Sequence, residues 1–114
     1  MVFNTFIKEA HKNSLDHGFW EDVEVKWLKI AFMDKENKVD VNAIGNRLML
    51  ITGEVAEAHE ALRKNDRTNF AEELADIVIR VADLCGGLGI DLEKEIITKM
   101  AKNKLREYKH GKAF

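Results

Sequence analysis

Hydrophobic residues recur along this chain every three or four positions, a spacing typical of helices that bury one face. Residues 2–16 show this pattern first, and Gly18 is a suitable residue to end such a helix. Residues 19–40 follow no single period, and we expect a loop followed by a short helix there. Asp40 can cap a long helix over residues 41–64. The apolar stripe of this long helix consists of Ile44, Leu48, Ile51, Val55, Ala58 and Leu62.

Two more helices are expected in the second half of the chain. Asn69 and Glu72 have the spacing of a variant capping box, which predicts a helix that starts there and runs to about Leu84. The glycine-rich residues 86–89 are expected to end this helix. Asp91 can then cap a last helix. The residues of the last helix that we expect to face inward are Ile96, Met100 and Leu105.

The predicted helices are joined by short turns, which favour antiparallel neighbours. The 114 residues include no proline, so the long helices are not interrupted by one. The length corresponds to a single domain, residues 1–114. We therefore predict an all-α fold, an antiparallel bundle of four to five helices that is completed by oligomerisation.

Composition excludes several partners and locations. The formal net charge of −2 gives no support for a basic nucleic-acid-binding surface. No apolar run approaches the roughly 20 residues that span a bilayer, and the N-terminus lacks the pattern of a signal peptide. Cys85 is the single cysteine, which fits a reducing compartment. We therefore expect a cytoplasmic protein that binds neither nucleic acid nor membranes.

Four carboxylates form two pairs with helical spacing. Glu54 and Glu57 are three residues apart on one predicted helix. Glu73 and Asp76 are three residues apart on the next. Residues at this spacing project from the same face of a helix, one turn apart. Both pairs lie beside the apolar stripes, so in an antiparallel arrangement all four side chains can converge at the edge of a cleft.

Converging carboxylates repel one another unless a cation lies between them. Oxygen ligands favour Mg²⁺ or Mn²⁺ over Zn²⁺, and Mg²⁺ commonly bridges to substrate phosphates, which indicates phosphoryl chemistry. A di-iron site is disfavoured because none of the four carboxylates has a histidine three residues later. A single pair of this kind is usually a solvated surface feature, so a non-catalytic helical interaction module with an acidic face is the alternative.

The residues around the carboxylates resemble a known family. The segments GEVAEAHEALRK and NFAEELADIVIRVADLCGGLGIDLEKEIITKMAKNKLRE are similar to the MazG-like all-α nucleoside triphosphate pyrophosphohydrolases. That superfamily carries an ExxE motif, a spacer and an ExxD motif, which Glu54-x-x-Glu57 and Glu73-x-x-Asp76 match. The resemblance covers about Leu48 to Arg106. It implies an enzyme that cleaves an NTP or dNTP to the monophosphate and pyrophosphate by water attack at the α-phosphorus.

The resemblance also implies roles for individual residues. By position, the four carboxylates are Mg²⁺ ligands, with Mn²⁺ as a possible substitute. Glu54 and Glu57 are equal candidates for the carboxylate that orients the water or accepts its proton. Asn103 falls where the family carries a substrate-contacting asparagine. The basic residues that could meet the triphosphate are Lys99, Lys102, Arg80 and Arg106. Family members are oligomeric, so we expect a homotetramer made of two dimers, or alternatively a homodimer.

The chain departs from the family pattern in two places. Gly53 stands where many members have a second acidic residue before the first motif, so a nucleotide-binding protein without turnover is a further alternative. Residues 21–40 are longer than the usual connector, a region that often helps to form the base pocket. The preferred base and sugar are therefore not predicted.

Several residues outside the motifs have more than one interpretation. Trp20 and Phe19 could each stack on a nucleobase, although we expect at least one of them to pack in the core. Cys85 is expected to be a small core residue. Asp83 continues the helical face that carries the second motif, and we expect it to pair with Arg80 or with a basic residue of the last helix.

Overall fold

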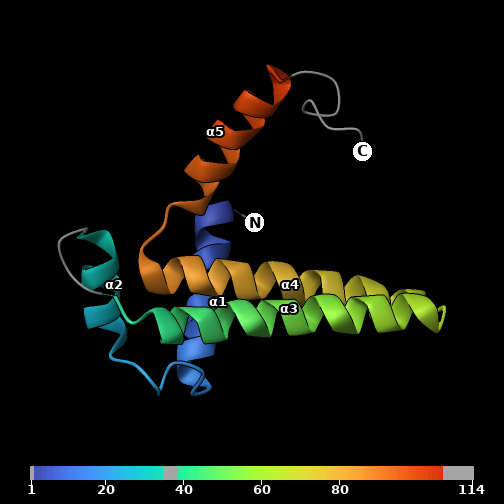
Figure 1. The fold of residues 1–114 in the computed structure, drawn as a ribbon, viewed down its shortest axis with the longest axis horizontal. Coiled ribbons are helices and arrows are strands. Elements are labelled where there is room, and N and C mark those ends of the chain that lie inside the picture. Colours follow the sequence, from blue (N-terminus) through green and yellow to red (C-terminus); the bar gives the residue numbers. More distant parts are fainter. Residues whose placement is uncertain (1, 35–38, 107–114) are drawn as a thin grey trace.

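The computed structural model describes residues 2–34 and 39–106, which form five α-helices and no β-strand (Figure 1). The helices are α1 (Phe3–Asp16), α2 (Val25–Met33), α3 (Val41–Arg63), α4 (Arg67–Leu88) and α5 (Leu92–Lys104). Helices α3 and α4 form a long antiparallel hairpin, and α1 packs across α4. The prediction of an all-α fold is confirmed for these residues.

Aspartate caps determine where the three C-terminal helices, α3, α4 and α5, begin. Asp40 and Asp91 cap α3 and α5 as predicted, because each carboxylate accepts the backbone N–H three residues later. Asp66 caps α4 in the same way and accepts from the backbone N–H of Asn69 over 3.0 Å. Helix α4 therefore begins at Arg67. The predicted start at Asn69 was wrong because the cap lies three residues earlier.

Helix α4 is also longer at its C-terminus than predicted. It continues to Leu88 instead of ending near Leu84. Gly89 then adopts a left-handed conformation with φ of +73°, which ends the helix in the way that glycine commonly does. The extension adds Leu88 to the core beside Leu84, so it buries apolar surface that a shorter helix would lose.

The two glycines inside this last turn allow close packing and do not end the helix. A Cβ atom at Gly87 would lie 2.7 Å from Cζ2 of Trp20, and one at Gly86 would lie 2.7 Å from Cβ of His11. Both distances are shorter than real Cβ contacts. The missing side chains therefore form a notch in which α1 and the following loop sit directly against α4.

Trp20 is the largest side chain in the core. It is 3% exposed and packs with Leu28, Leu84 and Leu88. The buried guanidinium of Arg47 lies 4.0 Å from the centroid of the Trp20 ring. The same guanidinium also bonds the loop between α1 and α2, through the Asp22 carboxylate at 2.6 Å and the Phe19 carbonyl at 3.0 Å. Arg47 therefore attaches that loop to α3.

Helix α5 points away from the hairpin and makes its main contacts with α1 (Figure 1). It has no buried residue. The predicted inward-facing residues Ile96, Met100 and Leu105 are 38%, 58% and 90% exposed. This prediction was wrong for the single chain because no other element of the described chain covers that face of α5.

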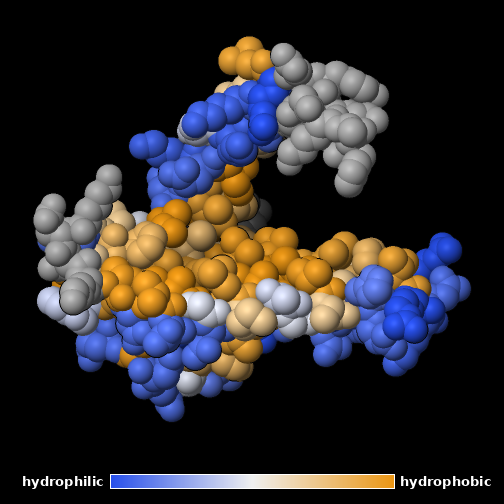
Figure 2. All heavy atoms as spheres, in the orientation of Figure 1, coloured by the Kyte–Doolittle hydropathy of each residue, from blue (hydrophilic) through white to orange (hydrophobic). Residues whose placement is uncertain are grey.

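A hydrophobic band follows α3 and α4 on the surface (Figure 2). Much of the predicted apolar stripe of α3 lies on the surface, including Leu48, Val55 and Leu62, each at least 50% exposed. Large exposed apolar patches commonly mark interaction surfaces. Among the described helices, none combines the length and the hydrophobicity that crossing a membrane requires.

The notch at Gly87 leads to a first prediction. The substitution Gly87→Ala should lower the free energy of unfolding by about 1–3 kcal/mol, because the added methyl group overlaps the Trp20 ring. Urea denaturation followed by circular dichroism measures this change. The matched control is Gly45→Ala in α3, where an added Cβ meets nothing within 4 Å and should not destabilise the chain. Equal stabilities of the two variants would contradict a tight contact at Gly87.

Candidate metal centre and adjoining cavity

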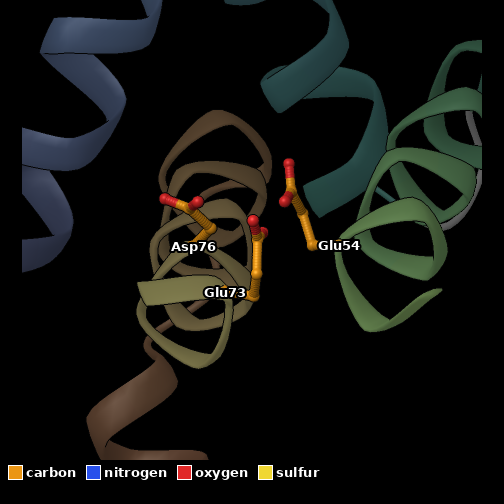
Figure 3. Close-up of side chains that lie close together, drawn as sticks. All are labelled: Glu54, Glu73 and Asp76. Carbon is orange, nitrogen blue, oxygen red and sulfur yellow. The ribbon is translucent and has the colours of Figure 1, made fainter. Parts of the chain in front are cut away.

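Three of the four predicted carboxylates come together where α3 and α4 pack side by side. Oxygens of Glu54, Glu73 and Asp76 all lie within 4.8 Å of one another. Figure 3 shows Glu54 on α3 approaching Glu73 and Asp76 on α4. The antiparallel hairpin thus brings two motifs to one place, as their helical spacing suggested.

Glu57 is the predicted carboxylate that lies outside this group of three. Its side chain is exposed on α3, one turn beyond Glu54. Its negative charge nevertheless contributes to raising the pKa of Glu73. Glu57 is therefore close enough to influence the group electrostatically, without being one of its converging oxygens.

The three carboxylates differ in their electrostatic surroundings. Arg80 Nε donates a hydrogen bond of 2.8 Å to Glu54 Oε1, and this bond holds the pKa of Glu54 below its ordinary value. The surroundings of Glu73 shift its pKa in the opposite direction. Its hydrogen bond with Glu54, its burial and the neighbouring negative charges raise its pKa to about 7. Among the described residues, Oε2 of Glu73 is buried and has no hydrogen-bond partner.

This donor set suits a hard divalent cation. Oxygen ligands on opposite sides of Mg²⁺ are about 4.2 Å apart, twice the usual Mg–O distance. The oxygens here lie within 4.8 Å of one another, so small side-chain rotations would place them around one ion. The buried, unpartnered oxygen of Glu73 is a polar atom that such an ion would satisfy. The residues present therefore fit a divalent metal.

A cavity of about 230 Å³ adjoins the carboxylates. It extends between α1 and α4 as far as the loop that follows α1. Its wall combines acidic, basic, amide, hydroxyl and aromatic groups. The lining residues are Ala10, Asn13, Ser14, Phe19, Glu54, Asp76, Ile79, Arg80 and Asp83. The candidate metal centre thus opens into a space that can hold a small organic molecule.

Comparison with known families agrees with this site. The sequence profile of the MazG nucleotide pyrophosphohydrolase domain matches residues 45–110, which is more than half of the chain. The chain belongs to this family. No curated protein and no solved structure matches the chain significantly. The matched region includes both carboxylate motifs of α3 and α4, so the family resemblance noted in the sequence is confirmed.

The other site residues predicted in this MazG domain do not all lie near the carboxylates. Arg80 lines the cavity, as its position one turn after Asp76 suggested. Lys99, Lys102 and Asn103 are exposed on α5 and do not line this cavity. Within a single chain they are separated from the site because α5 turns away from the hairpin.

Trp20 does not occupy the position expected of a base-stacking residue. Its ring is buried against α4 and leaves no open face for a ligand. The exposed aromatic ring beside the cavity is that of Phe19, which is 58% exposed. Of the two neighbouring aromatic residues, Trp20 packs in the core and Phe19 stays exposed. Cys85 is buried in α4, as predicted, and burial raises the pKa of its thiol.

Asp83 makes different contacts from those predicted. Its Oδ1 accepts a hydrogen bond from Trp20 Nε1 over 2.8 Å and lies 2.8 Å from His11 Nδ1. It therefore pairs with α1 and the following loop, and not with Arg80 or α5. Sequence spacing placed Asp83 on the correct face of α4 but gave no information about which distant residues pack there.

Sequence reasoning missed Asn13 and Ser14 as residues of the site. Both lie near the end of α1 and line the cavity. Neither belongs to a recognisable motif, and their contact with the site depends on how α1 crosses α4. The available signal was weak: two small polar residues interrupt the helical pattern just before Gly18.

The raised pKa of Glu73 predicts how metal binding depends on pH. Below about pH 7 the folded, metal-free protein keeps a proton on Glu73, and a cation must displace it. The affinity for Mg²⁺ or Mn²⁺ should therefore fall by up to about tenfold per pH unit below pH 7. Titration calorimetry at pH 6, 7 and 8 measures this change. Glu73→Gln should bind more weakly and lose most of the pH dependence, whereas Glu72→Gln should retain it.

The same pKa shift has a consequence for stability. Because the folded state binds this proton more tightly than the unfolded state, the stabilisation is complete below the ordinary value of 4.5. It is lost as pH rises through about 7, and added metal should restore stability there. A metal affinity that is constant from pH 6 to 8 would contradict both expectations.

Proposed function

We propose that this chain is a Mg²⁺-dependent nucleoside triphosphate pyrophosphohydrolase, which cleaves an NTP or dNTP to the monophosphate and pyrophosphate. The observation that carries the proposal is the convergence of Glu54, Glu73 and Asp76 beside a cavity that Glu54 and Asp76 line. Membership of the MazG nucleotide pyrophosphohydrolase domain family supports the same reaction class. Water attack at the α-phosphorus is part of the proposal.

The carboxylates supply the negative charge that this reaction needs for its cations. Glu54, Glu73 and Asp76 would hold Mg²⁺ or Mn²⁺, and Glu57 would complete the set after a change of rotamer. When bound, the cations would neutralise charge on the triphosphate and on the departing pyrophosphate. Either Glu54 or Glu57 would orient the attacking water or accept its proton.

Arg80 provides a positive charge at the cavity wall. Its guanidinium is bonded to Glu54, and its side chain is 31% exposed. A guanidinium can form paired hydrogen bonds with phosphate oxygens, so Arg80 is suited to bind the triphosphate beside the carboxylates. When cation and substrate bind together, Arg80 would leave the Glu54 carboxylate and bond a phosphate oxygen instead.

We further propose that a second copy of the chain completes the site. Lys99, Lys102 and Asn103 lie on α5, which is not packed on the hairpin of its own chain. An oligomer that covers the apolar band of α3 and α4 would give these residues a route to the phosphates of a neighbouring site. A homotetramer made of two dimers is the first expectation and a homodimer the second. A cytoplasmic location is part of the same proposal.

A pyrophosphate-release assay over the common NTPs and dNTPs tests the reaction. The expected primary products are pyrophosphate and the nucleoside monophosphate, with Mg²⁺ or Mn²⁺ required. Glu54→Gln and Asp76→Asn should each lower kcat/KM by about 1,000-fold, because a bound cation stabilises the transition state by several kcal/mol. Glu72→Gln, an exposed neighbour outside the group, should retain activity.

Two results would contradict this reaction. Orthophosphate as the only primary product would exclude attack at the α-phosphorus. Metal binding together with nucleotide binding, but without any product, would instead support the non-catalytic alternative that the absence of an acidic residue at Gly53 allows.

The oligomer has a separate test. Val78→Asp places a charge on the apolar band, at a residue that is 50% exposed on α4. The substitution should reduce the molar mass measured by light scattering while the helical circular dichroism spectrum is retained. Lys8→Asp, at an exposed position of α1, is the control and should leave the mass unchanged. A wild-type chain that is monomeric at micromolar concentration would contradict the proposal.

A further inference from the structure

Asp83 lies in the same cavity as the carboxylate group but at a distance from it. It follows Asp76 by seven residues on α4, which is two helical turns or about 10 Å along the helix. Arg80 lies between the two on the same face. If phosphates bind at the carboxylates and Arg80, the part of the substrate that reaches Asp83 is the nucleobase, because the ribose occupies the space between.

One carboxylate oxygen of Asp83 is hydrogen-bonded within the protein, and the other can accept a hydrogen bond from a ligand. Oδ1 is fixed by Trp20 Nε1 and by His11 Nδ1, each at 2.8 Å. Within the described part of the chain, Oδ2 has no hydrogen-bond partner, and the side chain is only 17% exposed. Trp20 and His11 are themselves fixed by the glycine notch of α4. Because Oδ1 is held by two partners, the carboxylate of Asp83, a residue that lines the cavity, has a defined position.

A base site also needs a flat apolar surface on which the base can stack, and Phe19 provides one. Its ring is 58% exposed beside the cavity, and the Arg80 guanidinium lies 6.0 Å from its centroid. Aromatic side chains stack on bases of any sequence and give no preference by themselves. Selection must therefore come from polar groups on the wall, and the Asp83 carboxylate is one that hydrogen bonds hold in place.

We propose that Phe19 stacks on the nucleobase of the substrate and that Asp83 accepts a hydrogen bond from an exocyclic amino group of that base. The inference rests on the proposed function. A carboxylate can accept from the N4 amino group of cytosine, whereas uracil and thymine present a carbonyl oxygen at that position. Cytidine triphosphates are therefore the preferred pyrimidine substrates over uridine triphosphates.

The simpler interpretation is that Asp83 only anchors Trp20 and His11. An anchor would affect all substrates alike, since both bonds form within the protein. A base-reading role predicts instead a change in the ratio between two substrates that differ at one position of the ring. CTP and UTP are such a pair, because they share the sugar, the triphosphate and the ring size.

The experiment compares kcat/KM for pyrophosphate release from CTP and from UTP. The wild-type ratio should favour CTP by roughly 10- to 100-fold. Asp83→Asn keeps an oxygen that can accept from Trp20 and presents an amide that donates to the uracil carbonyl, so the ratio should fall to about one or reverse. Asp16→Asn, on the exposed end of α1, is the matched control and should retain the wild-type ratio. Circular dichroism verifies that each variant is folded.

The outcomes separate this inference from the proposed function. Equal cleavage of CTP and UTP by the wild type, or an equal loss for both in Asp83→Asn, would overturn base reading while leaving the reaction intact. If no nucleotide is cleaved, calorimetry with CMP and UMP still tests recognition. Tighter binding of CMP, lost in Asp83→Asn and weakened in Phe19→Ala, would support it, and equal binding would overturn it.

Discussion

The packing of one indole ring determines how the N-terminal third of this chain meets the rest. Trp20 enters a notch that exists only because Gly87 has no side chain, and its Nε1 reaches Asp83 from there. Arg47 covers the ring and bonds the surrounding loop to α3. Burial of the ring supplies the apolar contribution, and the hydrogen bond removes the cost of burying the indole N–H. The cavity beside the carboxylates exists because this contact holds α1 and Phe19 in place.

The carboxylate group is constrained in a different way. Packing α3 against α4 forces Glu54, Glu73 and Asp76 together, although their charges repel. The metal-free chain reduces this repulsion through Arg80 on Glu54 and through the raised pKa of Glu73. Both arrangements are reversible, since a cation can displace a proton and take the place of a guanidinium. The three carboxylate oxygens already lie within 4.8 Å of one another, so the proposed cation would need only side-chain adjustments.

The apolar band of the hairpin and the isolated position of α5 have the same explanation if a second copy of the chain covers both. A helix with no buried residue gains little stability from its own chain. Leu62 on α3 and Met100 on α5 are each 58% exposed, and large exposed apolar patches commonly mark interaction surfaces. The substrate-binding roles proposed for Lys99, Lys102 and Asn103 depend on what covers these surfaces.

The sequence by itself determined the helices, the aspartate caps of α3 and α5 and the two carboxylate motifs, because helical spacing and capping act over three or four residues. It misplaced both ends of α4, since Asp66 and the packing of Gly86 and Gly87 were not recognised in the local pattern. It did not show that Trp20 is buried while Phe19 is exposed, nor that Asp83 pairs with His11. Those outcomes depend on where α1 crosses α4, a contact between residues more than sixty positions apart, and only the tertiary structure decided them.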